Sequence, residues 1–419
     1  MLRGESKKKA ILVGVDYYPK NKMTIYMEEL RALAETLAIE VVTMFTQDGK
    51  QASAQFKIGS GKVEEIKTYT ESVPVDLIIF NDELTGSQIR NLENALDLPV
   101  IDRTLLILDI FAKRAKTKEA MLQVEVAQLK YMLPRLTSLH ASFERQQGGI
   151  GSRGPGEKKI ELDRRRIENE INQLEKELAN IVNVRQANRK QRKKSLIKTV
   201  AIVGYTNAGK STLMNTLLEH SNAKEEKDVK VKDQLFATLE TSSRRIELPN
   251  TKPFVLTDTI GFVSNLPIDL VDSFKSTLEE IQEADLLLHV VDFSNPYYFY
   301  QIMTTQKVLE DLGADEIETL YVFNKIDLNQ ENLPHGFTPS VKISLTDKTN
   351  IDVLLEQIIY LLSKDDTVVI YHIPYDKGNI VNVLMEYSQI LSRTHDEKGT
   401  LIKARVSSVI RHQYKDYEV

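Results

Sequence analysis

The sequence contains no cysteine in 419 residues, and this absence excludes disulfide bonds and thiolate metal sites. It also has no run of about 18 apolar residues, the length that a membrane-spanning helix requires. The apolar run that begins at Ala10 is too short for the core of a signal peptide. We therefore expect a cytoplasmic protein without a membrane span.

An overall excess of positive charge is also absent. The chain has 55 Lys and Arg residues against 60 Asp and Glu residues, for a net charge of -5. Any contact with RNA must therefore come from local basic segments and not from the average charge. Hydrophobic residues make up 42% of the chain, enough for several buried cores. At roughly 100–200 residues per domain, the length predicts two to four domains.

Short strand-like and helical segments alternate over residues 1–108. This alternation predicts an N-terminal domain with a parallel sheet. The expected strands cover 10–16, 40–45 and 75–80, and the expected helices cover 23–38, 63–70 and 86–96.

Long charged helical patterns replace the strands over residues 109–197. One helix is expected to run through 112–133 and to end at Pro134. A second helix carries apolar residues at spacings of three, four and seven over Ile160–Val184. The glycine-rich stretch Gln146–Glu157 between them cannot be helix interior. The segment therefore predicts an antiparallel helical hairpin with a loop at its tip.

Strand–helix alternation resumes over residues 198–363 and predicts a second α/β domain with a mostly parallel sheet. The remaining residues, 364–419, show strand patterns at 368–373 and 402–407 around a helical pattern at 380–391. They predict a small C-terminal α/β domain. The fold class is therefore α/β with several domains.

The strongest motif is Gly204–Ser211, which reads G-x-x-x-x-G-K-S between an expected strand and an expected helix. Its glycines let the backbone curl, so that successive N–H groups face phosphate oxygens. The positive N-terminus of the new helix favours the same anion. Lys210 is expected to reach the β- and γ-phosphates, and the Ser211 hydroxyl is expected to bind Mg²⁺. The candidate phosphate-binding residues are Gly204, Tyr205, Thr206, Asn207, Ala208, Gly209, Lys210, Ser211 and Thr212.

A second motif, D-x-x-G, follows an apolar strand at Phe254–Asp258. An aspartate at the C-terminal end of such a strand lies where α/β proteins bind ligands. Asp258 is expected to hold Mg²⁺ through water, and the Gly261 N–H is expected to sense the γ-phosphate. The candidate residues are Asp258, Thr259, Ile260 and Gly261.

The third motif, Asn324–Asp327, has the form N-K-x-D and again follows a strand. The Asp327 carboxylate can accept hydrogen bonds from guanine N1 and N2, whereas adenine lacks this pair of donors. The bound nucleotide is therefore expected to be GTP or GDP. The candidate guanine-binding residues are Asn324, Lys325, Ile326, Asp327, Ser344 and Leu345.

A threonine between the first two motifs is the candidate second hydroxyl ligand of Mg²⁺. We expect this ligand to be Thr238, with Thr241 as the nearby alternative. The predicted magnesium ligands are Ser211, Thr238 and Asp258, and the predicted catalytic residues are Lys210, Thr238 and Gly261. The loop around Thr238 is expected to contact the nucleotide through Phe236, Ala237, Thr238, Leu239 and Glu240.

Phe262 occupies the position after Gly261, where many GTPases place a glutamine that orients water. A phenyl ring cannot orient water. We therefore expect slow hydrolysis by the isolated protein, with the water held by another group or by an activating partner. Packing of Phe262 into the surrounding loops is the alternative role.

Basic segments offer candidate RNA contacts. Residues 185–198 carry seven Lys and Arg residues without an acid, and Arg145 and Arg153 flank the glycine-rich loop. An exposed glycine-rich tip with arginines suits a narrow space lined by RNA. A solvated linker and a flexible hairpin turn are the alternatives. Gly59–Lys62 is a truncated phosphate loop, for which a tight turn before a helix is the favoured interpretation.

The motifs together resemble those of HflX-type GTPases, members of the Obg-HflX superfamily of translation-factor-related proteins. The resemblance covers nearly the whole chain. It rests on the three nucleotide motifs and on these further segments: Ile58–Lys62, Ile101–Thr104, Asp109–Ala115, Gln128–Tyr131, Leu133–Leu136, Gly148–Glu157, Glu161–Arg165 and Ala284–Asp292.

The resemblance implies binding to the large ribosomal subunit through the Gly148–Gly156 loop and the basic hairpin. It further implies splitting of stalled ribosomes under stress or antibiotic challenge, by a protein that is monomeric when free. Two other functions remain open from the sequence. One is a GTPase in ribosome assembly or RNA modification, and the other is a GTP-dependent regulator that does not act on the ribosome.

Overall fold

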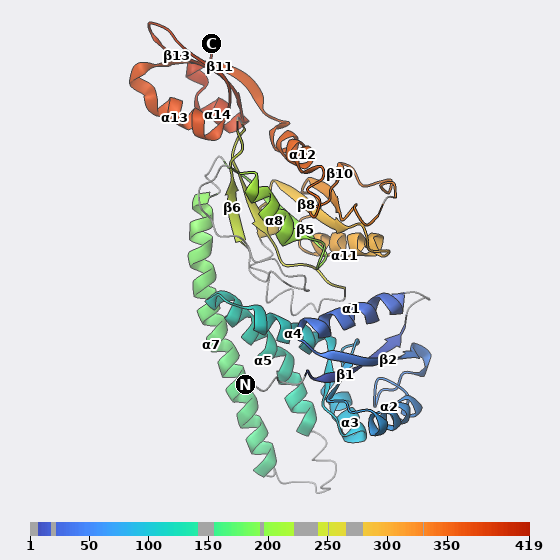
Figure 1. The fold of residues 1–419 in the computed structure, drawn as a ribbon. Helices are drawn as coiled ribbons and strands as arrows, with labels where there is room; N and C mark the ends of the chain where they lie inside the picture. Colours follow the sequence, from blue (N-terminus) through green and yellow to red (C-terminus); the bar gives the residue numbers. More distant parts are fainter. Residues whose placement is uncertain are drawn as a thin grey trace, which may run out of the picture. The chain divides into compact units, whose positions relative to one another are not determined.

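A computed structural model describes residues 7–17, 22–140, 155–192, 197–221, 242–249, 251–264, 280–329 and 331–419. The chain divides into two compact units (Figure 1). The first contains Met1–Asn183, Gln234–Phe236 and Ser264–Phe274. The second contains Val184–Asp233, Ala237–Val263 and Lys275–Val419.

The first unit is built on a four-stranded parallel sheet with the order β2-β1-β3-β4. Its strands are β1 (Lys9–Asp16), β2 (Glu40–Asp48), β3 (Leu77–Phe80) and β4 (Val100–Asp102). Its first helices are α1 (Lys22–Thr36), η1 (Gly49–Gln51), α2 (Ser60–Ser72), α3 (Gly86–Leu96) and α4 (Arg103–Arg114). The predicted parallel α/β arrangement is confirmed. Strand β4 was not expected, because three residues are too few to show a hydrophobic period.

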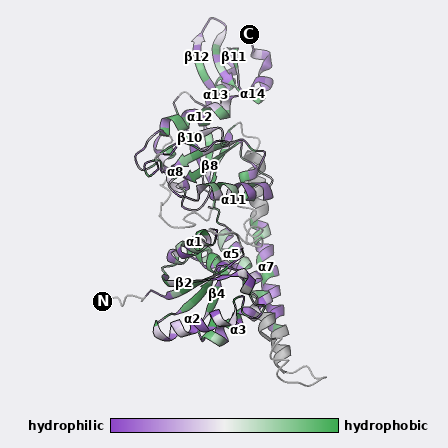
Figure 2. Ribbon diagram, turned by 90° about the vertical axis from the view of Figure 1, so that its right-hand side faces the viewer, coloured by the Kyte–Doolittle hydropathy of each residue, from purple (hydrophilic) through white to green (hydrophobic). Residues whose placement is uncertain are grey.

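Two long helices follow, α5 (Lys118–His140) and α7 (Pro155–Arg192). The two helices run antiparallel to one another (Figure 1). Helix α7 is hydrophilic over much of its length, and Figure 2 colours a large part of it purple. In the described residues, no helix is both long enough and apolar enough to cross a lipid bilayer.

The expected helix end at Pro134 is wrong, because α5 continues to His140. Proline removes only the donor to the Lys130 carbonyl, and the Arg135 guanidinium donates to the neighbouring Tyr131 carbonyl at 2.6 Å. The single helix predicted over residues 112–133 is also divided, because α4 ends at Arg114 and α5 begins at Lys118. Extended backbone at Ala115 ends α4, and the Thr117 hydroxyl accepts from the Ala120 N–H at the start of α5.

The second unit contains a six-stranded sheet with the order β10-β9-β8-β5-β7-β6, in which only β6 is antiparallel to its neighbour. The mostly parallel sheet predicted from the sequence is confirmed. Its strands are β5 (Lys198–Gly204), β6 (Ser242–Ile246), β7 (Phe254–Asp258), β8 (Leu286–Asp292), β9 (Thr319–Asn324) and β10 (Ser340–Lys342). Its helices are α8 (Lys210–Glu219), α11 (Tyr298–Asp311) and α12 (Ile351–Ser363).

A small antiparallel sheet with the order β11-β13-β12 follows in the same unit. Its elements are β11 (Thr367–Pro374), η2 (Tyr375–Lys377), α13 (Gly378–Tyr387), β12 (Gln389–His395), β13 (Gly399–Val406), α14 (Ser408–Gln413) and η3 (Lys415–Tyr417). The helix predicted to end at residue 391 ends at Tyr387. Ser388 is extended, and Ile390 pairs with Ala404 in the sheet, so residues 389–391 belong to a strand.

Helix α12 offers a direct test of this packing, because adjacent residues face opposite environments. Leu354 is fully buried in the core beneath the sheet, whereas Val353 is 45% exposed. We expect Leu354→Ala to lower the free energy of unfolding by about 2–5 kcal/mol. Val353→Ala, the matched control, should change it by less than about 0.5 kcal/mol. Urea denaturation followed by circular dichroism measures both, and equal losses would contradict the assigned burial.

Candidate active site

The carboxyl ends of four parallel strands meet at one edge of the six-stranded sheet, which is where α/β proteins bind ligands. Strands β5, β7, β8 and β9 lie side by side, with Ile202 paired to Asp258 and Asp292 paired to Asn324. The three nucleotide motifs follow β5, β7 and β9. The fold therefore brings together residues that are more than 100 positions apart.

The loop after β5 has a backbone conformation that requires glycine at both of its ends. Gly204 has φ 144° and Gly209 has φ 101°, in a region that side chains with a Cβ rarely adopt. A Cβ at Gly204 would lie 2.3 Å from the Val290 carbonyl oxygen, and one at Gly209 would lie 2.4 Å from Asn324 Nδ2. The loop therefore fits tightly against β8 and β9.

Lys210, the first residue of α8, is buried beneath this loop. Its ammonium donates to the carbonyls of Gly204 at 3.1 Å and Tyr205 at 2.7 Å. Burial lowers the pKa of Lys210 to about 8, and the nearby Asp258 charge opposes this shift. The ammonium is therefore held at the loop that the sequence predicts to bind phosphate.

His289 on β8 lies near Lys210 and was not expected at the site. Burial, followed by the Lys210 charge, lowers the pKa of His289 to about 3, so its imidazole is neutral at pH 7. Its ring contacts Tyr321 with centroids 5.3 Å apart. The available signal was a lone histidine in the otherwise apolar strand Leu286–Asp292.

The predicted magnesium ligands of the second unit lie together where the structure describes them. The Ser211 hydroxyl donates to Asp258 Oδ2 at 2.9 Å, and Asp258 is fully buried. A hydroxyl and a carboxylate are oxygen ligands of the kind that Mg²⁺ prefers, so these two residues fit the ion. Thr259 has another role, because its hydroxyl donates to the Ile202 carbonyl at 2.6 Å.

The segment after Asp258 is bonded to the loop after β5. The Phe262 N–H donates to the Gly204 carbonyl at 3.2 Å, and the Thr206 N–H donates to the Phe262 carbonyl at 2.8 Å. Phe262 is 1% exposed, so its side chain packs into the protein. A Cβ at Gly261 would lie 2.8 Å from Lys210 Nζ, and the closeness of this approach explains the glycine.

The candidate guanine-binding residues also converge. The Ser344 hydroxyl donates to Asp327 Oδ1 at 2.7 Å and orients this carboxylate. Asn324 donates to the Ala208 carbonyl at 2.9 Å and accepts from the Leu345 N–H at 3.3 Å. The side-chain amide of Asn324 therefore joins the loop predicted to bind phosphate to the loop that contains Leu345.

Lys325 has φ 64° and forms a 2.7 Å ion pair with Asp292 at the end of β8. The Ile326 N–H donates to the Ile343 carbonyl at 3.3 Å. Asp292 also accepts from the Ser294 hydroxyl at 2.6 Å. This pair fixes the start of the N-K-x-D loop, and Asp292 was not among the predicted site residues.

Some predicted residues lie outside the described part of the chain. They are Phe236, Ala237, Thr238, Leu239 and Glu240, the loop residues 148–154, and the flanking Arg145 and Arg153. The predicted turn at Gly59–Lys62 is wrong, because Ser60–Lys62 already belong to the first turn of α2. Gly59 precedes the first residue of α2 and donates to Gln47 Oε1 at 3.0 Å, and Lys62 pairs with Glu65 on the same helix.

Three family models match consecutive parts of the chain. "GTP-binding GTPase N-terminal" matches residues 24–112, and "GTP-binding GTPase Middle Region" matches residues 114–192. "50S ribosome-binding GTPase" matches residues 199–325, which contain the first two nucleotide motifs and the first two residues of the third.

Individual relatives match over nearly the full length. "GTPase HflX" of Caldanaerobacter subterraneus is 47% identical over 411 residues, covering 98% of this chain and 94% of the relative. "GTPase HflX" of Escherichia coli is 36% identical over 409 residues, covering 95% and 93%. Among solved structures, a GTP-binding protein from Sulfolobus solfataricus in complex with GDP is 26% identical with a TM-score of 0.44, covering 85% of this chain and 99% of that one.

The geometry around Asp327 predicts its role in base selection. Asp327→Asn replaces one acceptor with a donor amide, so the pairing with guanine N1 and N2 is lost. We expect GTP affinity to fall by about 10²-fold or more, and xanthosine triphosphate to become the preferred ligand. Competition with a fluorescent nucleotide measures both, with Asp315→Asn on an exposed turn as the control. Unchanged preference for GTP would contradict the assignment.

The lowered pKa of Lys210 predicts a pH dependence of nucleotide binding. Phosphate oxygens favour the charged lysine, so binding raises the pKa of Lys210 from about 8. Affinity for GTP should therefore fall as pH rises through about 8, with uptake of most of one proton on binding at pH 8.5. Calorimetry in two buffers of different ionisation enthalpy measures this uptake. The Lys210→Arg variant stays charged, so its binding of GTP should be accompanied by no proton uptake. Equal proton uptake by both proteins would refute the assignment.

Proposed function

Because the chain belongs to the HflX family of GTPases, we propose that it binds the large ribosomal subunit and uses GTP to remodel or split stalled ribosomes under stress or antibiotic challenge. Its enzymatic activity is GTP hydrolysis. The observation that carries the proposal is the match of residues 199–325, which hold the phosphate and Mg²⁺ motifs, to ribosome-binding GTPases. A helical hairpin precedes this site in the chain.

The residues of the site divide the chemistry between them. Lys210 and backbone N–H groups of the Gly204–Gly209 loop other than that of Thr206, which donates to Phe262, would hold the phosphates. The α8 N-terminus would add its positive potential. Ser211 and Asp258 would hold Mg²⁺, which supplies neutralisation of the charge that develops on the phosphates. Asp327, oriented by Ser344, would select guanine. Thr238 is proposed as the second hydroxyl ligand.

Hydrolysis by the free protein is proposed to be slow. The side chain after Gly261 belongs to Phe262, which is buried and carries no group that could orient water. An activating partner must then complete the site, as the supplied groups of other GTPases do. The large ribosomal subunit is the proposed partner, and the free protein is proposed to be a monomer in the cytoplasm.

The hairpin is proposed to carry a probe to the ribosome. Helix α5 has 23 residues and, at about 1.5 Å per residue, spans about 35 Å. A tip at Gly148–Gly156 adds little bulk and can follow the wall of a crevice. Arg145 and Arg153 would supply contacts to phosphates or stacked bases worth about 1–3 kcal/mol each.

Deleting residues 148–156 tests this function. GTP binding by the free variant should stay within about twofold of the parent value, because the nucleotide site lies in the other unit. Stimulation of hydrolysis by purified large subunits should be lost, together with any separation of 70S ribosomes in sucrose gradients. A variant with an alternating Gly-Ser segment of the same length serves as the control for chain length and should also be inactive. Splitting at the parent rate by either variant would show that the loop is only a turn.

A further inference from the structure

Two adjacent buried residues of opposite charge lie where β4 meets α4. Asp102 is 0% exposed and Arg103 is 2% exposed. Asp102 Oδ1 accepts from the Leu105 N–H at 3.0 Å and caps α4. Burial of a charge is costly unless it is paired and hydrogen-bonded. The partners of these two residues therefore indicate what the pair holds in place.

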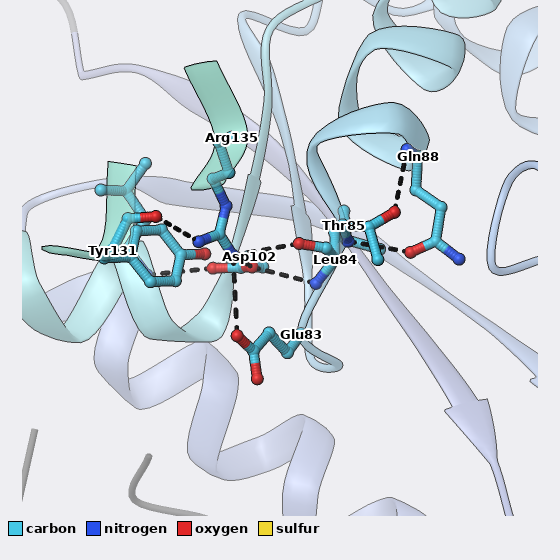
Figure 3. A network of polar contacts seen from close by, with 8 residues as sticks. Glu83, Leu84, Thr85, Gln88, Asp102, Tyr131 and Arg135 are labelled. Carbon is cyan, nitrogen blue, oxygen red and sulfur yellow. Dashed lines mark hydrogen bonds and ion pairs between the residues drawn. The ribbon is translucent and has the colours of Figure 1, made fainter. Parts of the chain in front are cut away.

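Asp102 holds the hairpin. Its Oδ2 accepts from Arg135 of α5 at 3.0 Å and from the Leu84 N–H at 3.1 Å (Figure 3). The same guanidinium donates to the carbonyls of Leu84 at 3.0 Å and Tyr131 at 2.6 Å, and it lies 3.2 Å from the centre of the Tyr131 ring. Arg135 therefore ties α5 to the N-terminal sheet five residues before the helix ends at His140.

Arg103 holds a segment from much later in the chain. It forms a buried 2.7 Å ion pair with Glu29 of α1 and donates to Asn81 at 3.1 Å. It also donates to the carbonyl of Ser264, 161 residues away, at 2.9 Å. Glu29 accepts from the Ser264 N–H at 3.2 Å and from the Ser264 hydroxyl. Ser264 is fully buried. The Arg103–Glu29 pair therefore fixes both its backbone and its side chain.

Ser264 lies three residues after Gly261, and the boundary between the two units falls at the bond between Val263 and Ser264. On the other side of that bond, Phe262 is hydrogen-bonded to Gly204 and Thr206 of the phosphate loop. Only Phe262 and Val263 separate Gly261 from Ser264. A movement of Gly261 on nucleotide exchange is therefore expected to displace Ser264.

The geometry points to the Asp102–Arg103 pair as the coupling element between the hairpin and the segment that follows Gly261. Asp102 positions Arg135 and Arg103 positions Ser264, and the two share one peptide bond at a rigid helix start. A shift at either partner is transmitted to the other through this bond. The inference rests on the proposed function, in which the hairpin engages the ribosome, and it assigns Arg103 and Arg135 as positioning residues.

Lysine substitutions test the coupling without removing charge from the interior. Arg135→Lys and Arg103→Lys keep a cation beside Asp102 and Glu29, but a single ammonium cannot reach all the acceptors of the planar guanidinium. Basal hydrolysis and GTP affinity should stay within about twofold of the parent values, because both residues lie outside the nucleotide site. The kcat stimulated by large subunits should fall about tenfold. The subunit concentration for half-maximal stimulation should change by less than about twofold.

Additivity distinguishes coupling from independent damage. If the two arginines act in one element, the double variant should be no slower than the slower single variant. Lys130→Gln is the matched control. It lies on the same helix as Arg135 and removes an exposed 2.7 Å ion pair with Glu175, so it should leave stimulation unchanged. Multiplicative losses in the double variant, or full stimulation in both single variants, would overturn the inference.

A ribosome-independent measurement separates this inference from the proposed function. Hydrogen exchange at residues 131–140 of the free protein should differ between GDP and a non-hydrolysable GTP analogue, and Arg103→Lys should abolish the difference. If the parent shows this difference without stimulation by large subunits, the coupling stands and the proposed partner is wrong. If stimulation occurs without any nucleotide-dependent exchange in α5, the coupling is wrong and the proposed function stands.

Discussion

The nucleotide site depends on the contact between the phosphate loop and the segment that contains Gly261. Two backbone hydrogen bonds join Phe262 to Gly204 and Thr206, and Gly261 lies against the Lys210 ammonium. Neither glycine could be replaced without a clash, because a Cβ would meet a carbonyl at Gly204 or the lysine at Gly261. The contact places Gly261, whose N–H is predicted to sense the γ-phosphate, next to Lys210, which is predicted to bind phosphate. A movement of one residue is therefore expected to displace the other.

Buried charges perform different tasks in the two units. In the second unit, Lys210 lies beneath a loop whose carbonyls satisfy it, and its lowered pKa reflects the cost of burial. In the first unit, Arg103 and Arg135 donate to carboxylates and carbonyls that come from distant parts of the chain. Such pairs contribute little net stability, but breaking one is costly. They therefore suit positioning, and their partners are the elements proposed to move with the nucleotide.

Local patterns predicted that the three motifs would meet at one edge of the six-stranded sheet, because each motif is a short run at the end of an apolar strand. Ser344 was predicted as well, and the structure shows it bonded to Asp327. Strands β4, β6, β10 and β12 were missed, because a short or exposed strand is defined by its partners and not by its own sequence. The predicted helix end at Pro134 was wrong, because a proline lowers helix propensity but does not end α5, which continues to His140. The contacts of Ser264 leave no local pattern, because their partners are 161 and 235 residues away.

The central claim is that the nucleotide controls an interaction with the large ribosomal subunit. Equilibrium binding of the intact chain to purified large subunits tests it most directly, measured with a non-hydrolysable GTP analogue, with GDP and without nucleotide. We expect tight binding with the analogue and binding at least about tenfold weaker with GDP, a coupling of about 1.4 kcal/mol. Equal affinity in all three states, or no binding in any of them, would contradict it.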